Sequence, residues 1–378
     1  MLLSDRTLGE PELGAETVPA EAPAQARRTR RRLMTLATVL VTVGFTYLAL
    51  SGIDLESAWA ALESSNFWWL LPALVAFGLG NVARALRWRS LFVPDRRPPR
   101  TTTMNAMMIG YLYNNILPAR AGEPARVLVL TQRSSSPPVE ITGTVVLERV
   151  YDLVSLLMIF FIAKPWLPSV KWVGAAAILG GVLALGIAAV ATTLVVFGDR
   201  PLRVALRPLR RFAPFTEERM ERTVAELAHG LSGLHRRRVA LEAFVWSTIA
   251  WLCSMTCAYF VTLAFHLNVG FAAGVLVTVA VGIGMVLPSA PAAVGVFEGA
   301  TLIALKAFGI PHSTALPYAL VLHLVNFVPF VVVGAALLHY NSRHPVTPKR
   351  VAPEAGATGN QAAPDAPAIT AGSSRPAT

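Results

Sequence analysis

Long apolar runs alternate with short polar connections along most of this chain. A helix crosses the hydrocarbon core of a bilayer with about 20 mainly apolar residues. Six runs approach or exceed that length and are predicted as full spans: residues 33–53, 66–83, 141–163, 172–197, 243–265 and 317–340. Two more apolar stretches, 101–119 and 267–310, are interrupted by proline, glycine and charged residues. The pattern predicts an all-α polytopic membrane protein with two unusual segments.

Positive charge in the connections sets the expected orientation. Arginines cluster just before residue 33, whereas the connection 54–65 carries acidic residues and no Lys or Arg. The connections 84–100 and 199–242 are rich in arginine, the second with ten arginines against six acidic residues. Arginine-rich connections stay in the cytoplasm. The connections 84–100 and 199–242 both fall on that side only if 101–126 enters the membrane and returns as a re-entrant helical hairpin. Arg343, Lys349 and Arg350 place the C-terminus in the cytoplasm as well, so 267–310 must begin and end outside, as a second hairpin.

The resulting order is span, span, hairpin, span, and it occurs twice with opposite orientation, in residues 33–163 and 172–340. Both interruptions carry a similar tripeptide, Ile116-Leu-Pro118 in one and Val286-Leu-Pro288 in the other. Inverted repeats with interrupted helices are an architecture of alternating-access transporters, whose substrate site lies where the broken helices meet. The sequence therefore predicts an inverted repeat with a substrate site between its two hairpins.

Ionisable residues occur in the first repeat where hydrocarbon would exclude them. A charge near the centre of a membrane helix costs about 2.5–3.5 kcal/mol on insertion scales, so several together need partners. Six such residues follow Pro118 or lie within the third span: Arg120, Glu123, Arg126, Glu148, Arg149 and Asp152. These basic and acidic groups can balance one another between hairpin and span. An ion-pair network that locks the two segments and a substrate-contacting site both explain them, and the two interpretations are compatible.

The second interruption offers backbone groups as well as side chains. Proline removes a backbone donor and breaks a helix, so freed carbonyls and a new helix N-terminus could face a polar headgroup. The predicted substrate-binding set therefore adds four residues of this interruption and two asparagines that precede the first one: Pro288, Pro291, Gly295, Glu298, Asn114 and Asn115. Helix capping is the alternative role for the asparagines. His323 and Asn326 are interpreted as contacts between helices.

Composition excludes several classes of function. The chain is 54% hydrophobic and 15% charged, whereas soluble domains carry about 25% charged residues. Its net charge of +11 comes mainly from arginines that flank apolar runs, so no nucleic-acid partner is expected. Cys253 and Cys257 have no nearby His to complete a metal site and are expected to be core side chains; no metal or cofactor is predicted. The chain has no Gly-x-x-x-x-Gly-Lys-Ser/Thr motif, so ATP hydrolysis is not expected.

Three polar segments lie outside the predicted spans. Residues 1–32 and 341–378 are rich in small and polar residues and are expected to be disordered cytoplasmic tails. Within the cytoplasmic loop 199–242, apolar residues recur with a 4-3-4-3 spacing over 220–234. This amphipathic helix is expected to lie on the inner membrane surface or to pack on the bundle, and a short dimerising coiled coil is the alternative.

Three motifs are spaced along the predicted membrane domain: Asn-x-x-x-Pro-x-Arg-x-Gly-Glu-x-x-Arg at 114–126, Glu-Arg-x-x-Asp at 148–152 and Pro-x-x-Pro-x-x-x-Gly-x-x-Glu at 288–298. Together they resemble the transmembrane domain of the lysylphosphatidylglycerol synthase family, also called flippase-like. The resemblance implies a multi-pass domain of a prokaryotic inner (plasma) membrane that moves a lipid between leaflets. Family members that also make the lipid carry a large soluble aminoacyl-transfer domain, for which no polar region of this chain is long enough. The family usually has Gly-Gly where this chain has Ala292-Ala293.

The sequence thus predicts a lipid flippase or lipid-linked transporter that moves a phospholipid or another polar-headgroup lipid between membrane leaflets. One alternative is an intramembrane enzyme acting on a lipid phosphate, with Glu123, Glu148 or Asp152 as acid or base. Another is a non-transporting subunit of an envelope-lipid synthesis complex. A lipid-synthesis enzyme and a second copy of the chain are the candidate protein partners. The transporter is preferred, and no enzymatic activity is expected, because arginines flank the carboxylates and no nucleophile accompanies them.

Overall fold

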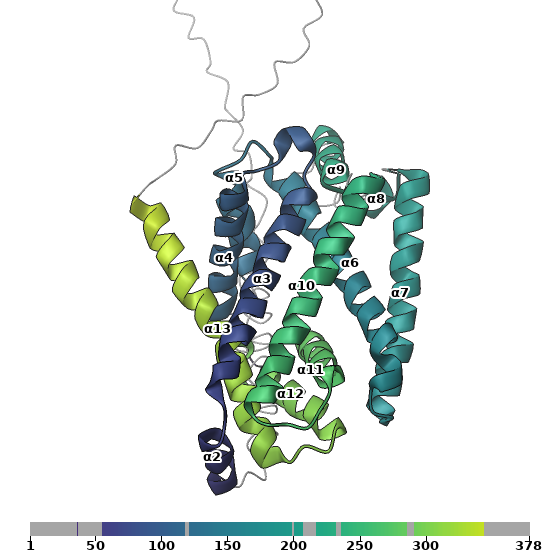
Figure 1. Ribbon diagram of the computed structural model, residues 1–378. Helices are drawn as coiled ribbons and strands as arrows, with labels where there is room; N and C mark the ends of the chain where they lie inside the picture. Colours follow the sequence, from purple (N-terminus) through teal and green to yellow (C-terminus); the bar gives the residue numbers. More distant parts are fainter. Residues whose placement is uncertain are drawn as a thin grey trace, which may run out of the picture.

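The computed structural model describes residues 55–117, 121–198, 200–206, 217–231, 236–285 and 291–343, together with residue 36. These residues form twelve α-helices joined by turns and short 3-10 segments, with no strand among them (Figure 1). The helices are α2 (Leu55–Glu63), α3 (Leu70–Ser90), α4 (Arg100–Ile116), α5 (Gly122–Thr131), α6 (Pro138–Ala163), α7 (Lys171–Phe197), α8 (Arg200–Leu206), α9 (Glu217–Leu231), α10 (Arg237–Ala264), α11 (Phe271–Gly284), α12 (Val296–Ala307) and α13 (His312–Arg343). The all-α prediction is confirmed for the described residues.

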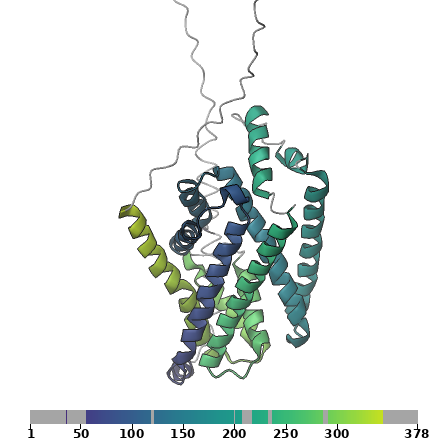
Figure 2. The ribbon, with the colours of Figure 1, turned by 45° about the horizontal axis from the view of Figure 1, so that its top comes forward.

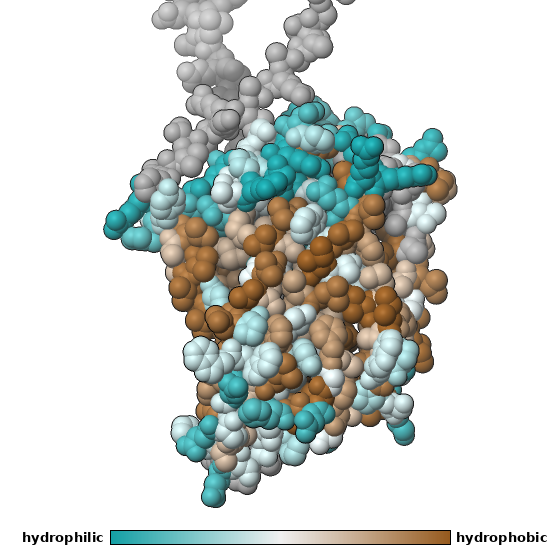
Figure 3. All heavy atoms as spheres, in the orientation of Figure 1, coloured by the Kyte–Doolittle hydropathy of each residue, from teal (hydrophilic) through white to brown (hydrophobic). Residues whose placement is uncertain are grey.

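An apolar belt covers the middle of the helix bundle. Figure 3 shows hydrophobic residues across the middle of one face and hydrophilic residues toward both ends. Large apolar side chains point outward: on α7, Ile178 is 73% exposed and Leu185 is 74% exposed. Soluble monomers rarely expose contiguous apolar surface of this extent. The surface is therefore that of a protein whose sides face lipid.

Three of the described helical segments are long and apolar enough to cross a membrane: Phe67–Ser90, Arg237–Ala264 and His312–Arg343. They correspond to the second, fifth and sixth predicted spans. The third and fourth predicted spans are α6 and α7, of 26 and 27 residues. The first predicted span, 33–53, lies outside the described residues except for residue 36, and it stays a prediction.

The predicted end of the second span, at residue 83, is wrong. The helix α3 continues to Ser90 and so includes Arg84 and Arg87, which the hydrophobic pattern had assigned to a cytoplasmic connection. The side chain of Arg87 is only 1% exposed, and both arginines reach partners on neighbouring helices. Because these partners replace water, the helix can continue past its last purely apolar turn.

Both interrupted stretches form helical hairpins, α4–α5 and α11–α12, in which the second helix packs against the first. They lie toward opposite ends of the bundle, α4–α5 in the upper half of Figure 1 and α11–α12 in the lower half. The first hairpin is closed at a glycine: a Cβ built on Gly122 would lie 1.9 Å from the carbonyl oxygen of Gly110 and 2.5 Å from Oδ1 of Asn114. Entry of the hairpins into a membrane from opposite faces, and the inverted repeat, stay predictions.

The helices α3 and α10 come from different halves of the chain and lie side by side in both ribbon views (Figures 1 and 2). Theirs is the most extensive contact between described helices. A Cβ built on Gly80 would lie 3.1 Å from the Cβ of Cys253 and 3.4 Å from the carbonyl oxygen of Ala250. Small residues let membrane helices approach closely and gain dispersion contacts. Cys257, one turn further along α10, is 1% exposed and belongs to the apolar core.

The helix α9 packs on α6. Its apolar residues Met220 and Val224 are 5% and 1% exposed. A Cβ built on Gly230 would lie 2.4 Å from the carbonyl oxygen of Glu140, so the two helices touch through their backbones. The amphipathic helix predicted over 220–234 therefore packs on the bundle, and residues 232–235 lie outside the described part of the chain.

Candidate functional site

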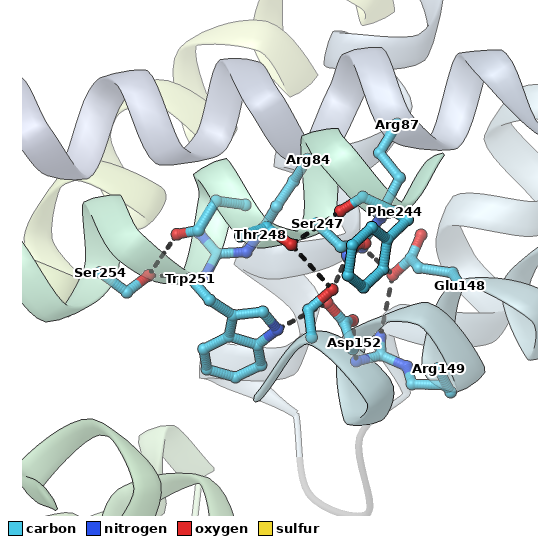
Figure 4. Close-up of polar contacts among 12 residues, drawn as sticks. Arg84, Arg87, Glu148, Arg149, Asp152, Phe244, Ser247, Thr248, Trp251 and Ser254 are labelled. Atoms are coloured by element: carbon cyan, nitrogen blue, oxygen red, sulfur yellow. Dashed lines mark hydrogen bonds and ion pairs between the residues drawn. The ribbon is translucent and has the colours of Figure 1, made fainter. Parts of the chain in front are cut away.

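Six ionisable side chains from α3, α5 and α6 meet in one group, which we call the ionic cluster: Arg87, Glu123, Arg126, Glu148, Arg149 and Asp152. Figure 4 shows Arg87, Glu148, Arg149 and Asp152 turned toward one another, beside α10. Three guanidinium groups face three carboxylates, so the cluster is neutral when all six groups are ionised. Buried charges need such pairing, because an isolated ion in a low-dielectric interior is strongly destabilising.

Glu148 is the centre of the ionic cluster. It lies on α6, is 1% exposed, and accepts hydrogen bonds from Nη1 of Arg126 on both carboxylate oxygens at 3.2 Å. Arg87 of α3 approaches from the other side, with Nη2 at 3.1 Å from Oε1. Glu148 therefore joins the first hairpin to α3, and charge-assisted contacts of this kind are the strong ones.

Asp152 lies one turn further along α6 and connects the cluster to α10. It pairs with Arg87 and accepts a hydrogen bond from the indole Nε1 of Trp251 at 3.1 Å. Arg87 also donates to the hydroxyl of Ser247 on α10 at 3.2 Å. Helices of both halves of the chain thus contribute to a single polar site (Figure 4).

Arg149 and Glu123 form the accessible rim of the cluster. The Arg149 side chain is 54% exposed and lies 2.5 Å from Oε1 of Glu123, which is 31% exposed. The other oxygen of Glu123 lies 2.6 Å from Nη2 of Arg126. One guanidinium at this site is therefore open to a ligand, while Arg87 and Arg126 are enclosed.

Local structure holds Arg126 in place. Its guanidinium carbon lies 4.9 Å from the ring centroid of Trp88, a cation–π geometry, and Trp88 donates to Thr144 of α6 at 3.1 Å. At the hairpin turn, the side chain of Asn114 accepts a hydrogen bond from the backbone N–H of Gly122 at 2.9 Å. Asn114 thus satisfies a backbone donor at the start of α5, and its predicted contact with a substrate stays a prediction.

A second polar group, the Glu298–His323 pair, joins the other hairpin to α13. Oε2 of Glu298 accepts from the backbone N–H of Gly295 at 2.7 Å, and Oε1 lies 2.5 Å from Nδ1 of His323 on α13. Nε2 of the same imidazole lies 3.0 Å from the carbonyl oxygen of Ala292. Both ring nitrogens thus face oxygens, and Phe297 stacks on the imidazole with ring centroids 4.5 Å apart. His323 is confirmed as a contact between helices, whereas Asn326 donates to Leu322 of its own helix.

Comparison with known proteins identifies the family. The family model described as the lysylphosphatidylglycerol synthase TM region matches residues 35–334. The chain belongs to this family. It is similar to a UPF0104 membrane protein of Methanocaldococcus jannaschii, with 23% identity over 241 residues, which cover 61% of this chain and 94% of that protein. It is also similar to a UPF0104 membrane protein of Methanothermobacter thermautotrophicus, with 23% identity over 281 residues, 71% of this chain and 82% of that protein. The chain is thus a multi-pass membrane protein of the lysylphosphatidylglycerol synthase TM region family.

Two of the three family motifs predicted from the sequence converge in the ionic cluster, and the third does not. The first motif supplies Glu123 and Arg126, and the second supplies Glu148, Arg149 and Asp152. Pro291, Gly295 and Glu298 of the third motif lie in the α11–α12 hairpin, where they shape the Glu298–His323 pair. Arg120 and Pro288 lie outside the described residues. Asn115 joins neither group; its buried Nδ2 has no hydrogen-bond partner among the described residues.

Sequence analysis missed the two arginines of α3. Arg87 belongs to the ionic cluster, and Arg84 donates to Ser254 of α10 at 2.8 Å with its guanidinium 5.8 Å from the Trp251 ring. Both were counted as loop charges when the orientation was assigned. Their three-residue spacing, which puts them on one helical face, is the signal that could have found them.

The departure from the family pattern at Ala292-Ala293 leaves these residues in a strained backbone conformation. Their φ angles are +60° and +59°, in the left-handed region that costs an L-residue about 1–2 kcal/mol. Glycine avoids that strain but loses more entropy on folding, by about 0.5–1 kcal/mol. We therefore expect Ala292→Gly with Ala293→Gly to stabilise the protein by up to about 1 kcal/mol, measured as a higher midpoint of thermal unfolding in detergent.

The matched control is Ala336→Gly in α13, where the residue is exposed and helical. There glycine should destabilise by about 1 kcal/mol because it lowers helix propensity. Equal destabilisation at both sites would contradict the strained conformation at 292–293.

Proposed function

We propose that this protein is a lipid flippase or lipid-linked transporter that moves a polar-headgroup lipid between the leaflets of a prokaryotic inner membrane. The observation that carries the proposal is the ionic cluster, with Glu148 1% exposed at its centre and Arg149 54% exposed at its rim. A charged headgroup cannot cross hydrocarbon unaided. The accessible guanidinium of Arg149 lies within 4 Å of three carboxylates, those of Glu123, Glu148 and Asp152. A headgroup phosphate could take the place of one of these carboxylates at the guanidinium.

The two hairpins support a repeated architecture for this path. Each places a glutamate in the first turn of its second helix, Glu123 in α5 and Glu298 in α12. Each glutamate pairs with a basic side chain on the following long helix, Arg149 in α6 and His323 in α13. The separations along the chain are 26 and 25 residues. Equivalent contacts in hairpins at opposite ends of the bundle fit an inverted repeat with two re-entrant segments and alternating access.

The distribution of arginine supports a cytoplasmic location for the upper end of Figure 1. The connection that contains Arg96 and Arg97 leaves the upper end of α3, and the arginine-bearing helices α8 and α9 lie at the same end. The acidic helix α2 lies at the lower end. By the positive-inside rule the end of the bundle at which α13 ends is then proposed to be cytoplasmic, and the predicted span 33–53 would bring the N-terminus to the same side.

A transporter fits the contacts of the carboxylates better than an enzyme does. Glu123, Glu148 and Asp152 are each engaged by at least two arginine side chains. A general acid or base has to exchange a proton with the reacting group, whereas these carboxylates hold guanidinium groups in place. We therefore propose that the chain binds and moves a lipid without altering it.

Replacing Arg149 with glutamine should lower the rate of lipid transport about tenfold or more, because a hydrogen bond to a charged group contributes about 1.5–3 kcal/mol. Stability should change little, since pairs with an exposed partner contribute about 0–1 kcal/mol. The measurement is the rate at which a labelled phospholipid becomes accessible in the opposite leaflet of proteoliposomes. Arg100→Gln is the control, because Arg100 is an exposed arginine at the start of α4, outside the cluster.

Native protein that accelerated the movement of no phospholipid would contradict the proposed function. Equal transport by the Arg149→Gln and Arg100→Gln variants would contradict the role of the ionic cluster alone.

A further inference from the structure

A groove of about 700 Å³ lies between α6, α7 and α10, within the range of about 300–1,000 Å³ typical of small-molecule sites. Its lining is apolar apart from one cation and one hydroxyl, and includes Tyr151, Val154, Leu157, Ala184, Leu241 and Arg237. The sequence pattern gave no indication of it, because the apolar residues that line it are indistinguishable in sequence from those that face lipid.

The polar features of the groove are placed as an amphiphile requires. Arg237 is the first residue of α10, at the end of the helix that Figure 1 shows beside α8 and α9. Tyr151 of α6 is 7% exposed, and its buried hydroxyl has no hydrogen-bond partner among the described residues. A buried hydroxyl without a partner is destabilising, so it points to a missing acceptor.

The groove and the ionic cluster share two helices. On α6, Tyr151 is flanked by the cluster residues Arg149 and Asp152. On α10, the groove residues Arg237, Leu241 and Phe244 are followed at helical spacing by Ser247 and Trp251, which hydrogen-bond to the cluster residues Arg87 and Asp152. Figure 4 draws Phe244 on the same segment of α10 as Ser247, Thr248 and Trp251. A molecule in the groove therefore lies next to the charged site.

We propose that this groove binds an acyl chain of an anionic phospholipid, with the lipid phosphate at Arg237. The groove supplies apolar surface for the chain, and the basic run Arg236-Arg237-Arg238 supplies the opposite charge for the headgroup. Binding of the chain is independent of transport. The further proposal, that the groove holds the transported lipid beside the ionic cluster before transport, rests on the proposed function.

The groove is tested with phosphatidylglycerol that carries a diazirine in an acyl chain, added to the full-length protein in lipid nanodiscs. After illumination, cross-linked peptides of α6, α7 and α10 are quantified by mass spectrometry. Ala184→Trp fills the groove, whereas Leu185→Trp adds the same side chain to the neighbouring, 74% exposed position. We expect cross-linking at groove residues to fall at least fivefold in Ala184→Trp and to remain unchanged in Leu185→Trp.

A second groove variant distinguishes loss of lipid binding from misfolding of the Ala184→Trp protein. Leu241 lines the groove but is 64% exposed, so Leu241→Trp can be accommodated without disturbing the core. It should lower groove cross-linking as Ala184→Trp does. Native protein with cross-links spread evenly over its lipid-facing residues, or groove variants with undiminished cross-linking, would overturn the proposal.

The headgroup contact is tested by competition. Arg237→Gln should lower the preference for phosphatidylglycerol over phosphatidylcholine about fivefold, and Arg238→Gln, the adjacent exposed arginine that does not line the groove, should lower it less. Equal effects of the two variants on this preference would show that Arg237 does not contact the lipid phosphate. Cross-linking measures binding and not transport, so the two proposals can fail separately. Groove labelling without lipid transport would contradict the proposed flippase function but not the proposed groove. Lipid transport without groove labelling would contradict the groove but not the flippase function.

Discussion

Replacing Glu148 with glutamine is expected to lower the free energy of unfolding by about 3–5 kcal/mol, because three buried or half-buried guanidinium groups would then share two carboxylates and one positive charge would be uncompensated. Two guanidinium groups depend on this carboxylate, those of Arg87 and Arg126, and both side chains are no more than 2% exposed. The N–H₂ group of the glutamine side chain would also face one of these guanidinium groups, so that two hydrogen-bond donors would oppose each other. The measurement is the midpoint of thermal unfolding in detergent, together with the amount of folded protein recovered from membranes.

The control for this effect is Glu242→Gln on α10. That glutamate is 43% exposed and lies 3.7 Å from Arg97 at the surface, where a salt bridge contributes about 0–1 kcal/mol. A Glu148→Gln protein as stable as the Glu242→Gln protein would show that the cluster does not stabilise the fold.

Replacing Gly122 with alanine is expected to open the first hairpin. The added methyl would lie 1.9 Å from the carbonyl oxygen of Gly110, a backbone atom that cannot move without displacing α4. It would also displace the Asn114 side chain that accepts the Gly122 N–H. Since α5 carries Glu123 and Arg126, its displacement separates them from α6. Overpacking costs about 1–3 kcal/mol or more, and lipid transport in proteoliposomes should fall below detection.

Gly78→Ala in α3 is the matched control, because a Cβ there has nothing within 4 Å. Alanine at that position should be neutral or stabilising, since it raises helix propensity by about 1 kcal/mol. Normal stability and transport of the Gly122→Ala protein would contradict the close approach of α4 and α5.

The hydrophobic pattern predicted most of the helices. The length and polarity of an apolar run can be read from the local sequence, and a run in lipid has to form a helix to satisfy its backbone hydrogen bonds. The helices α6 and α7 begin and end within three residues of the predicted spans, whereas α10 and α13 begin six and five residues earlier than predicted. The interruptions at 118 and 288 correctly separated α4 from α5 and α11 from α12. Five of the six predicted charges of the first repeat, all but Arg120, meet in one cluster.

Tertiary contacts account for what the sequence could not predict. The partners of Arg87 are far from it in the sequence: Glu148 on α6 is 61 positions away and Ser247 on α10 is 160 positions away. The local sequence of Arg87 is therefore like that of any arginine that follows a membrane span. His323 on α13 pairs with Glu298 on α12, and neither local sequence shows that these two helices bring the side chains together. The acyl-chain groove likewise depends on how α7 and α10 stand relative to α6.

The close packing of α3 against α10 limits how the protein can change shape. These helices, one from each half of the chain, approach closely at Gly80 and Ala250 and are joined further along by contacts of Arg84 and Arg87 with α10. Packed helices of this kind accommodate rearrangement by small shear displacements. A slide of α3 along α10 would carry Arg87 past Ser247 and Trp251, so the same movement that shifts one half against the other would also exchange the partners of the buried guanidinium.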